Sequence, residues 1–260
     1  FLRLFHLQIV EGRQNRELAD GNRIQTKIIH APRGVIYDRN GKILAANSPA
    51  FRLNDPASTG HKVKLVSREQ AMEWEVKNDP RFLNLEVDNV RNYPLGEEFA
   101  HVVGFMGEIS EEQLKKEEFK NYLAGDQIGQ FGLESQYEKT LRGVDGGEII
   151  EVDSKGRKIR ALRYEPPKPG GNIYLSIDAL LQEQIFKSMK KTLAETNSCC
   201  GAAVALDPSN GKILALVSLP SFDPNIFSKN DNDAAISTIF SRPDSPVLNR
   251  AIGGTYPPGS

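Results

Sequence analysis

A proline- and glycine-rich segment, PPKPGG at residues 166–171, constrains the fold of this sequence more than any other feature. Proline lacks a backbone N–H and glycine loses extra conformational entropy in a regular element, so such a run interrupts both helices and strands. The chain has 260 residues, of which 39% are hydrophobic, and is therefore long enough for more than one core. We expect a domain boundary near residue 170.

Local patterns on both sides of this segment predict a mixture of strands and helices. The most specific pattern is a β-hairpin in which residues 35–37 and 42–45 flank DRNG, because Asn-Gly favours the positive φ of hairpin turns. Residues 51–66 are predicted to be a loop or a place where sequence has been lost. Further strands are expected at residues 148–152, 158–162, 172–176, 202–206 and 213–218, and helices from residue 67 and at residues 110–122 and 179–194.

The first ten residues, FLRLFHLQIV, are rich in apolar side chains and are followed by a polar run at residues 11–23. This pattern predicts a helix that extends to about residue 28. No stretch of the sequence approaches the roughly 18–20 apolar residues that span a membrane. Composition alone leaves two interpretations open, a short amphipathic helix or the last turns of a membrane anchor.

Composition argues against several classes of function. Lys plus Arg total 33 against 34 Asp plus Glu, so no basic surface typical of a nucleic-acid-binding protein is expected. The four histidines are scattered without metal-ligand spacing, which predicts no metal site. The only cysteines, Cys199 and Cys200, are adjacent, and we expect two unpaired, buried residues because adjacent cysteines make strained disulfides.

The segment APRGVIYDRNGKILA, residues 31–45, resembles the first signature of the pedestal of class B penicillin-binding proteins. Other segments that resemble this family follow in the same order, and they cover nearly the whole chain. Before the linker these segments resemble the elongation type of the family more than the division type. They are RNYP (91–94), HVVGFMG (101–107), GQFGLE (129–134), LSID (175–178), AVALDP (203–208), GKILA (211–215), SLPSFDPN (218–225), NRAI (249–252) and YPPGS (256–260).

The resemblance implies an α+β chain in three parts. Residues 1–30 would be the end of a membrane anchor with a juxtamembrane helix, whose start would lie before Phe1. Residues 31–165 would be an elongated pedestal of mixed hairpins and helices, of the dimerisation type. Residues 166–260 would begin a transpeptidase domain related to serine β-lactamases. The family has a longer insertion between the strand at residues 51–53 and the helix near residue 67, so the pedestal head is either shortened or missing from this sequence, and contacts made through the head are not carried over.

The resemblance assigns the acylating nucleophile to Ser260. By itself, a serine after Pro-Pro-Gly is most simply the N-cap of a helix. In the family this serine opens a Ser-x-x-Lys motif, in which the lysine one turn later helps to deprotonate the hydroxyl. That lysine and the later Ser-x-Asn and Lys-Thr-Gly motifs would lie after residue 260. Residues 1–260 by themselves are therefore expected to be inactive.

Structural roles are predicted for a second group of residues in the pedestal. Arg33, Asp38 and Arg39 are expected to form an ion-pair and turn cluster far from the active site. Glu134 is expected to be a structural carboxylate that holds the pedestal together. The complete predicted group is Arg33, Gly34, Asp38, Arg39, Gly41, Gly132 and Glu134.

The implied function is that of a bacterial peptidoglycan D,D-transpeptidase, which crosslinks stem peptides during cell-wall elongation through a serine acyl-enzyme. No cofactor is expected. Expected partners are stem peptides ending in D-Ala-D-Ala, β-lactams, a glycosyltransferase of the shape, elongation, division and sporulation (SEDS) family, and other elongation-complex proteins. A single anchor in the bacterial cytoplasmic membrane would leave most of the chain on its periplasmic or outer side. The alternatives are a non-catalytic scaffold that regulates a glycan polymerase through residues 1–165, and the division-type enzyme.

Overall fold

A computed structural model of the chain describes residues 24–53, 64–66, 68–79, 81–82, 85–153, 158–228 and 232–255. The chain divides into two compact units, each made of two separate stretches of sequence. One unit comprises residues 1–32 and 142–170, and the other comprises residues 33–141 and 171–260. The sequence predicts three consecutive domains, whereas each of these units combines two separate stretches of the chain. The domain boundaries stay a prediction.

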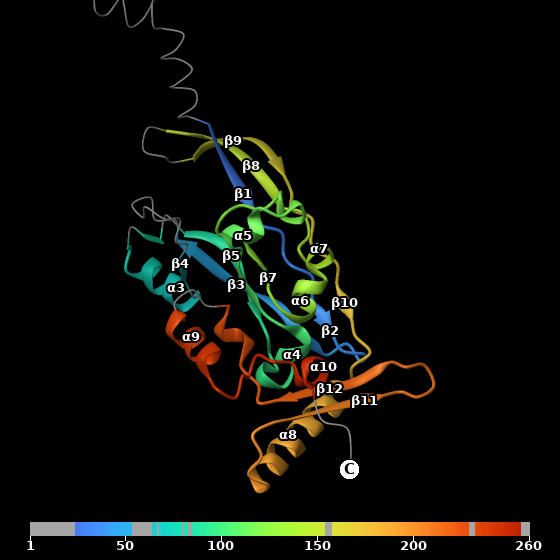
Figure 1. Cartoon of the computed structure of the whole chain (residues 1–260). Coiled ribbons are helices and arrows are strands. Elements are labelled where there is room, and N and C mark those ends of the chain that lie inside the picture. The colour runs from blue at the N-terminus through green and yellow to red at the C-terminus, as the bar shows by residue number, and fades with distance from the viewer. Residues whose placement is uncertain are drawn as a thin grey trace, which may run out of the picture. The chain divides into compact units, whose positions relative to one another are not determined.

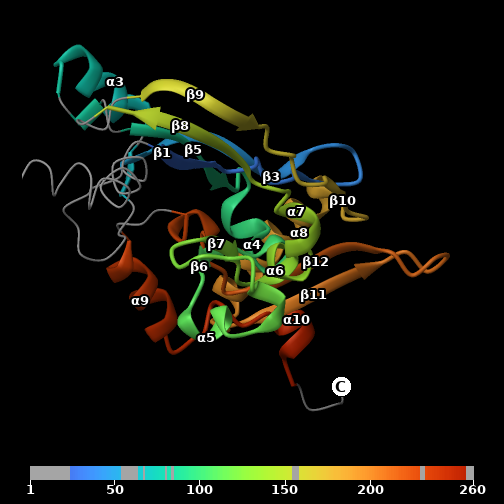
Figure 2. The same cartoon turned by 90° about the horizontal axis from the view of Figure 1, so that it is seen from above.

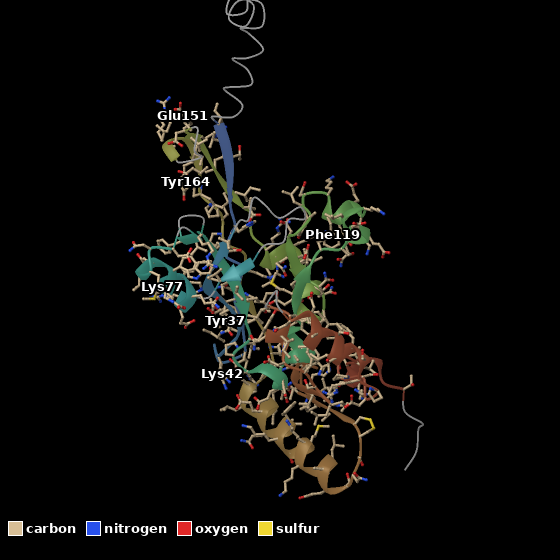
Figure 3. All side chains as sticks on the ribbon, turned by 90° about the vertical axis from the view of Figure 1, so that its left-hand side faces the viewer. Tyr37, Lys42, Lys77, Phe119, Glu151 and Tyr164 are labelled. Atoms are coloured by element: carbon tan, nitrogen blue, oxygen red, sulfur yellow. A yellow bond between two sulfur atoms is a disulfide. The ribbon has the colours of Figure 1, made fainter. Side chains whose placement is uncertain are left out.

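The smaller unit contains a three-stranded antiparallel sheet in the order β1-β8-β9 (Figure 1). Its strands are β1 (Ile24–Ile29), β8 (Gly146–Val152) and β9 (Lys158–Glu165). Figure 3 shows the side chains of Glu151 and Tyr164 on this sheet. The two strands predicted at residues 148–152 and 158–162 are confirmed.

The N-terminal helix predicted to reach about residue 28 is wrong for its last residues, because β1 is a strand that pairs along its whole length with β8. Isoleucine and threonine alternate with polar residues in IQTKII, a composition that fits a pleated strand better than a helix. Residues 1–23, which hold the predicted membrane anchor, lie outside the described residues. Within the described ranges, no helix has the length and apolar character needed to cross a membrane.

The larger unit is built on a five-stranded sheet in the order β10-β2-β3-β4, with β5 also paired to β3. The hairpin predicted at residues 35–45 is confirmed by β2 and β3, and Gly41 in its turn has a φ of +85°. The strand after the linker, β10, pairs in parallel with β2. The strands are β2 (Ile36–Tyr37), β3 (Ile43–Leu53), β4 (Lys64–Val66), β5 (Leu85–Asn92) and β10 (Ile173–Tyr174).

The loop predicted at residues 51–66 is wrong at both of its ends. Residues 51–53 continue β3, and there they pair with β4 on one side and β5 on the other. Cross-strand pairing on both edges outweighs the weak local pattern. Residues 54–63 lie outside the described residues.

Helix α8 (Ala179–Glu195) packs against a hairpin of β11 (Gly201–Leu206) and β12 (Ile213–Leu219) (Figure 1). These three elements confirm the predictions at residues 179–194, 202–206 and 213–218. Before the hairpin, Cys199 and Cys200 form a disulfide with each other, and Cys199 is exposed while Cys200 is half-buried. The prediction of two unpaired, buried cysteines is therefore wrong.

The remaining elements are short. The helix predicted from residue 67 is confirmed by α3. The helix predicted at residues 110–122 is wrong in length, because the helix observed there, α5, is a single turn. Ser110 and Gln113 form a capping box at its start, but none of its side chains is buried, so packing does not stabilise a longer helix. These elements are α3 (Arg68–Val76), η3 (Gly96–Glu98), α4 (Ala100–Val103), β6 (Met106–Glu108), α5 (Glu111–Leu114), η4 (Glu117–Phe119), β7 (Gln127–Gly129), α6 (Gly132–Gln136), α7 (Glu138–Leu141), η5 (Pro224–Ile226), α9 (Asp233–Ser241) and α10 (Arg250–Gly253).

Segments from both sides of the linker share the cores of the larger unit. In Figure 2, α4 from before the linker lies beside β12 from after it. The first core contains Leu44, Val103 and Leu141 from before the linker together with Ile177 from after it. A second core is aromatic, and in it the rings of Phe105, from before the linker, and Phe227, from after it, stack with centroids 3.8 Å apart. The predicted linker therefore separates two stretches of sequence that pack together.

Candidate functional site

Ser260, the predicted nucleophile, lies outside the described residues, but the chain that leads to it is described as far as Thr255. We call residues 246–255 the leading segment. Its only helix is the single turn α10, which Asn249 begins by accepting a hydrogen bond from the backbone N–H of Ala251 at 3.1 Å. Two buried side chains from other elements, Ser218 and His101, bind this segment, and the segment's own Asn249 binds back to His101.

Ser218, at the end of β12, binds two residues of the leading segment through one hydroxyl. Its Oγ accepts a hydrogen bond from the backbone N–H of Arg250 at 3.0 Å and donates to the carbonyl of Leu248 at 3.2 Å. The serine is only 2% exposed, because it lies in the buried part of β12. The hydroxyl thus uses both its donor and its acceptor capacity on the same turn of the chain.

His101 in α4 binds the beginning of the leading segment. Its Nε2 lies 2.8 Å from the carbonyl oxygen of Pro246, and a carbonyl can only accept, so Nε2 carries the proton. In return, Nδ2 of Asn249 donates to the backbone carbonyl of His101 at 3.3 Å. Burial lowers the pKa of His101 to about 4, the hydrogen bond to Pro246 opposes this change, and the charge of Arg250 adds to it. The ring is therefore neutral at physiological pH.

The predicted structural residues Arg33 and Glu134 lie together in a buried ion cluster. Arg33 Nε is 2.6 Å from Glu134 Oε2, and a second nitrogen of Arg33 is 2.6 Å from Glu138 Oε2. Arg91 Nε is 2.7 Å from the other oxygen of Glu134. Burial alone lowers the pKa of Arg33, but the two carboxylates outweigh burial and raise it. Two arginines thus compensate two buried carboxylates.

Two members of this ion cluster, Arg91 and Glu138, were not predicted. Arg91 belongs to the RNYP segment that carries the family resemblance, so a signal for it was present in the sequence. Glu138 resembles any other charged residue of a short surface helix, and its burial at 6% exposure follows from the packing of α7. Its Oε2 also accepts a hydrogen bond from the backbone N–H of Gly129 at 2.8 Å.

Asp38 lies in a separate network from Arg33. Its Oδ1 accepts hydrogen bonds from the backbone N–H of Asn40 at 2.8 Å and of Lys42 at 2.7 Å, and its Oδ2 accepts one from Ala179 at 3.1 Å. Asp38 thus fixes the hairpin turn and joins it to the start of α8. Arg39 is exposed, and its backbone N–H donates to the carbonyl of Ile177 at 3.0 Å. The structure does not bring Arg33, Asp38 and Arg39 into one cluster.

The three predicted glycines have different surroundings. Gly34 is buried, and its N–H donates to the carbonyl of Leu141 at 2.8 Å. Gly41 has open space around it, whereas a Cβ on Gly132 would lie 2.7 Å from the backbone nitrogen of Gly104. Gly132 therefore marks a close approach of two backbone segments, whereas Gly41 does not.

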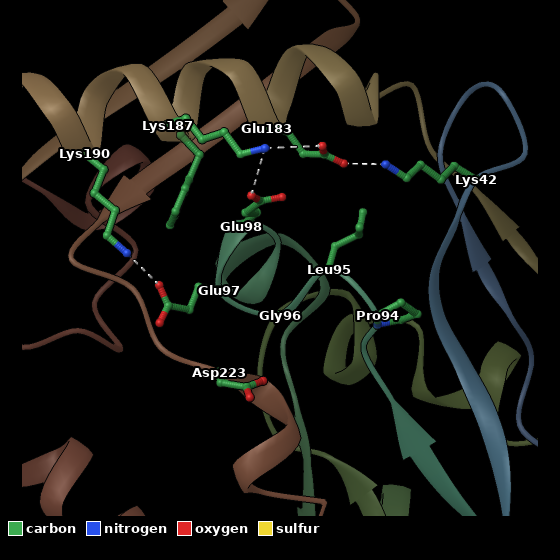
Figure 4. Close-up of a pocket in the computed structure, with 11 residues that line it drawn as sticks. Lys42, Pro94, Leu95, Gly96, Glu97, Glu98, Glu183, Lys187, Lys190 and Asp223 are labelled. Atoms are coloured by element: carbon green, nitrogen blue, oxygen red, sulfur yellow. Dashed lines mark hydrogen bonds and ion pairs between the residues drawn. The ribbon is translucent and has the colours of Figure 1, made fainter.

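A cavity of about 720 Å³ opens beside α8 and η3 (Figure 4). Charged side chains on its rim pair with each other, with 3.3 Å between Lys190 Nζ and Glu97 and 3.9 Å between Lys187 Nζ and Glu98. Among the described residues, no group of three or more His, Cys, Asp or Glu is arranged to hold a metal ion. The lining residues are Lys42, Pro94, Leu95, Gly96, Glu97, Glu98, Glu183, Phe186, Lys187, Lys190 and Asp223.

Comparisons with known proteins identify two types of domain in the chain. Residues 28–59 and 54–175 match the family model of the penicillin-binding protein dimerisation domain, and residues 201–260 match that of the penicillin-binding protein transpeptidase domain. Peptidoglycan D,D-transpeptidase MrdA of Acinetobacter baumannii is 33% identical over 99% of this chain, which covers 43% of that protein.

Two solved structures are similar to the chain. One is described as "Structural coordination of polymerization and crosslinking by a peptidoglycan synthase complex". It has a TM-score of 0.69 and 30% identity, and the match covers 96% of this chain and 48% of the chain in that structure. The other is Pseudomonas aeruginosa PBP2 in complex with WCK 5153. It has a TM-score of 0.58 and 33% identity, and the match covers 91% of this chain and 39% of the chain in that structure. The chain thus spans less than half the length of each of these relatives.

Proposed function

The chain belongs to the penicillin-binding protein family, and we propose that it is part of a peptidoglycan D,D-transpeptidase of the elongation type, penicillin-binding protein 2, with Ser260 as the nucleophile. The observation that carries this proposal is the match of residues 201–260 to the transpeptidase domain in a chain that is 33% identical to MrdA. The buried hydrogen bonds to the leading segment support it, because a nucleophile needs a fixed approach.

The reaction proposed for the whole protein is acyl transfer. The oxygen of Ser260 attacks the carbonyl of the penultimate D-Ala of a stem peptide, and the terminal D-Ala leaves with a proton. An amine of a neighbouring stem peptide then attacks the ester and releases the serine. A β-lactam acylates the same oxygen when its ring opens. No cofactor takes part in these steps.

The cellular setting is part of the same proposal. We propose that residues 1–30 end a single membrane anchor, that residues 31–165 form the pedestal, and that residues 166–260 begin the transpeptidase domain on the periplasmic or outer side of the cytoplasmic membrane. The solved peptidoglycan synthase complex couples polymerisation and crosslinking, which supports a SEDS glycosyltransferase as a partner of the pedestal. Other elongation-complex proteins and stem peptides ending in D-Ala-D-Ala complete the proposed partners.

Intact-mass spectrometry tests this proposal. The longest natural form of the protein is incubated with penicillin beside its Ser260→Ala variant. A penicilloyl adduct on the parent and none on the variant is the expected result. If a parent chain shown to continue through the Ser-x-x-Lys lysine forms no adduct, the transpeptidase proposal is wrong, and a scaffold that regulates a glycan polymerase replaces it.

A further inference from the structure

We infer that Ser218, His101 and Asn249 are positioning residues for the nucleophile, because they fix the register of the leading segment. This inference rests on the proposed function of Ser260. The three side chains are 2%, 6% and 9% exposed, and each makes a hydrogen bond to or from the leading segment. In the proposed acyl-transfer steps none of the three donates or accepts a proton. They would act indirectly, by fixing the backbone that leads to Ser260.

The hydroxyl of Ser218 provides the first fixed point. It accepts from the N–H of Arg250 and donates to the carbonyl of Leu248, two backbone groups that lie two residues apart. A shift of the segment by one residue relative to Ser218 would break both of these hydrogen bonds at once. An unpaired buried polar group is unfavourable, so the shifted register is disfavoured.

His101 and Asn249 provide a second fixed point on another element. The ring of His101 binds the carbonyl of Pro246, while the amide of Asn249 binds the carbonyl of His101, so the two residues hold the segment at both ends of residues 246–249. Helix α4 is itself held firmly, since its Ala100 and Val103 are 0% and 1% exposed in the cores of the larger unit. The segment is therefore bound to two elements, β12 and α4.

Asn249 joins this fixed point to the helix that follows. Its Oδ1 caps α10 while its Nδ2 holds His101, so the position at which α10 begins depends on the same side chain that sets the register. Only residues 254–259 separate α10 from Ser260. Under this inference a displacement at Asn249 misplaces Ser260, and an error of about 1 Å in a reacting group can slow a reaction about 100-fold.

The test uses the longest natural form of the protein and a fluorescent penicillin. Stopped-flow measurements give the dissociation constant of the initial complex and the rate constant of acylation separately. For Ser218→Ala we expect the rate constant of acylation to fall by about tenfold to 100-fold with little change in the dissociation constant. Ser218→Thr, which keeps the hydroxyl, should restore most of the rate. His101→Leu and His101→Gln form a second pair, because glutamine can keep the donor to Pro246.

Val217→Ala is the matched control for a loss of stability. Val217 is 1% exposed and adjoins Ser218 on β12, but it packs in the cluster of Phe186 and Leu219. This variant should lower the melting temperature and leave both acylation constants unchanged. The positioning role is wrong if Ser218→Ala is acylated as fast as the parent. It is also wrong if the acylation rate constants of both alanine variants fall in proportion to their loss of melting temperature. A parent that is not acylated would instead overturn the proposed function itself.

Discussion

Gly104 and Gly132 approach each other so closely that neither position has room for a side chain. A Cβ on Gly104 would lie 1.8 Å from the carbonyl oxygen of Phe131, and a Cβ on Gly132 would lie 2.7 Å from the nitrogen of Gly104. Both residues also have positive φ, +85° and +62°. This contact joins the end of α4, which holds His101, to the start of α6, which holds Glu134.

Gly104→Ala should therefore destabilise the protein by about 3 kcal/mol or more, because the backbone must move and the left-handed conformation becomes strained. Gly41→Ala is the matched control, since Gly41 has the same φ of +85° but no neighbouring atom within 4 Å of the place that a Cβ would take. It should cost only about 1–2 kcal/mol. Chemical denaturation of the two variants measures both values, and equal losses would show that packing at Gly104 is unimportant.

Arg33→Ala should destabilise the larger unit by about 3–5 kcal/mol, because it leaves the carboxylates of Glu134 and Glu138 buried with less compensating charge. Arg39→Ala removes an exposed arginine from the same segment and should change stability by about 0.5 kcal/mol or less. Thermal and chemical denaturation measure the difference. In the longest natural form, folded Arg33→Ala should still be acylated by penicillin at Ser260, and a normal melting temperature with lost acylation would contradict this prediction.

The burial of His101 predicts a loss of stability in mild acid. The unfolded chain binds a proton at the ordinary histidine pKa of 6.5, whereas the folded protein does so only near pH 4. This contribution to stability is complete above pH 6.5 and is lost as the pH falls from 6.5 towards 4, in total by about 3 kcal/mol. Denaturant titrations between pH 4 and 7.5 should show the corresponding slope in the parent.

His101→Gln serves as the control for this pH dependence, because its amide can still donate to Pro246 but does not titrate. The difference in unfolding free energy between the parent and this variant should change over the same pH range. A difference that stays constant from pH 7.5 to pH 4 would mean that His101 titrates normally in the folded protein.

Gln182→Leu should cost about 1–3 kcal/mol, because it leaves buried backbone groups without the amide that binds them. The Nε2 of Gln182 donates to the carbonyls of Leu216 at 2.7 Å and Glu98 at 2.9 Å, and its Oε1 accepts from the N–H of Leu216 at 2.7 Å. Gln184→Leu changes an exposed glutamine on the same helix and should be close to neutral. Similar midpoints of denaturation for the two variants would show that the hydrogen bonds of Gln182 contribute little.

Several elements could be predicted because their signals are local. The Asn-Gly turn specified the hairpin of β2 and β3, and apolar periodicity specified α8 and the hairpin of β11 and β12. Local signals failed where pairing with distant strands decided the outcome. Residues 24–29 form a strand because β8 is available much later in the chain, as the pairing of Lys27 with Glu148 shows.

The sequence by itself determined the family, the order of its segments and the residue proposed as the nucleophile, because a motif depends only on residue identity and spacing. Only the tertiary structure decided which charges meet and what holds the leading segment. Arg33 pairs with Glu134, which lies 101 residues later in the sequence, and His101 binds Pro246, which lies 145 residues later. Such partners are set by the packing of cores that combine both sides of the linker, and the free energy of burying a charge or an amide depends on that packing rather than on neighbours in the chain.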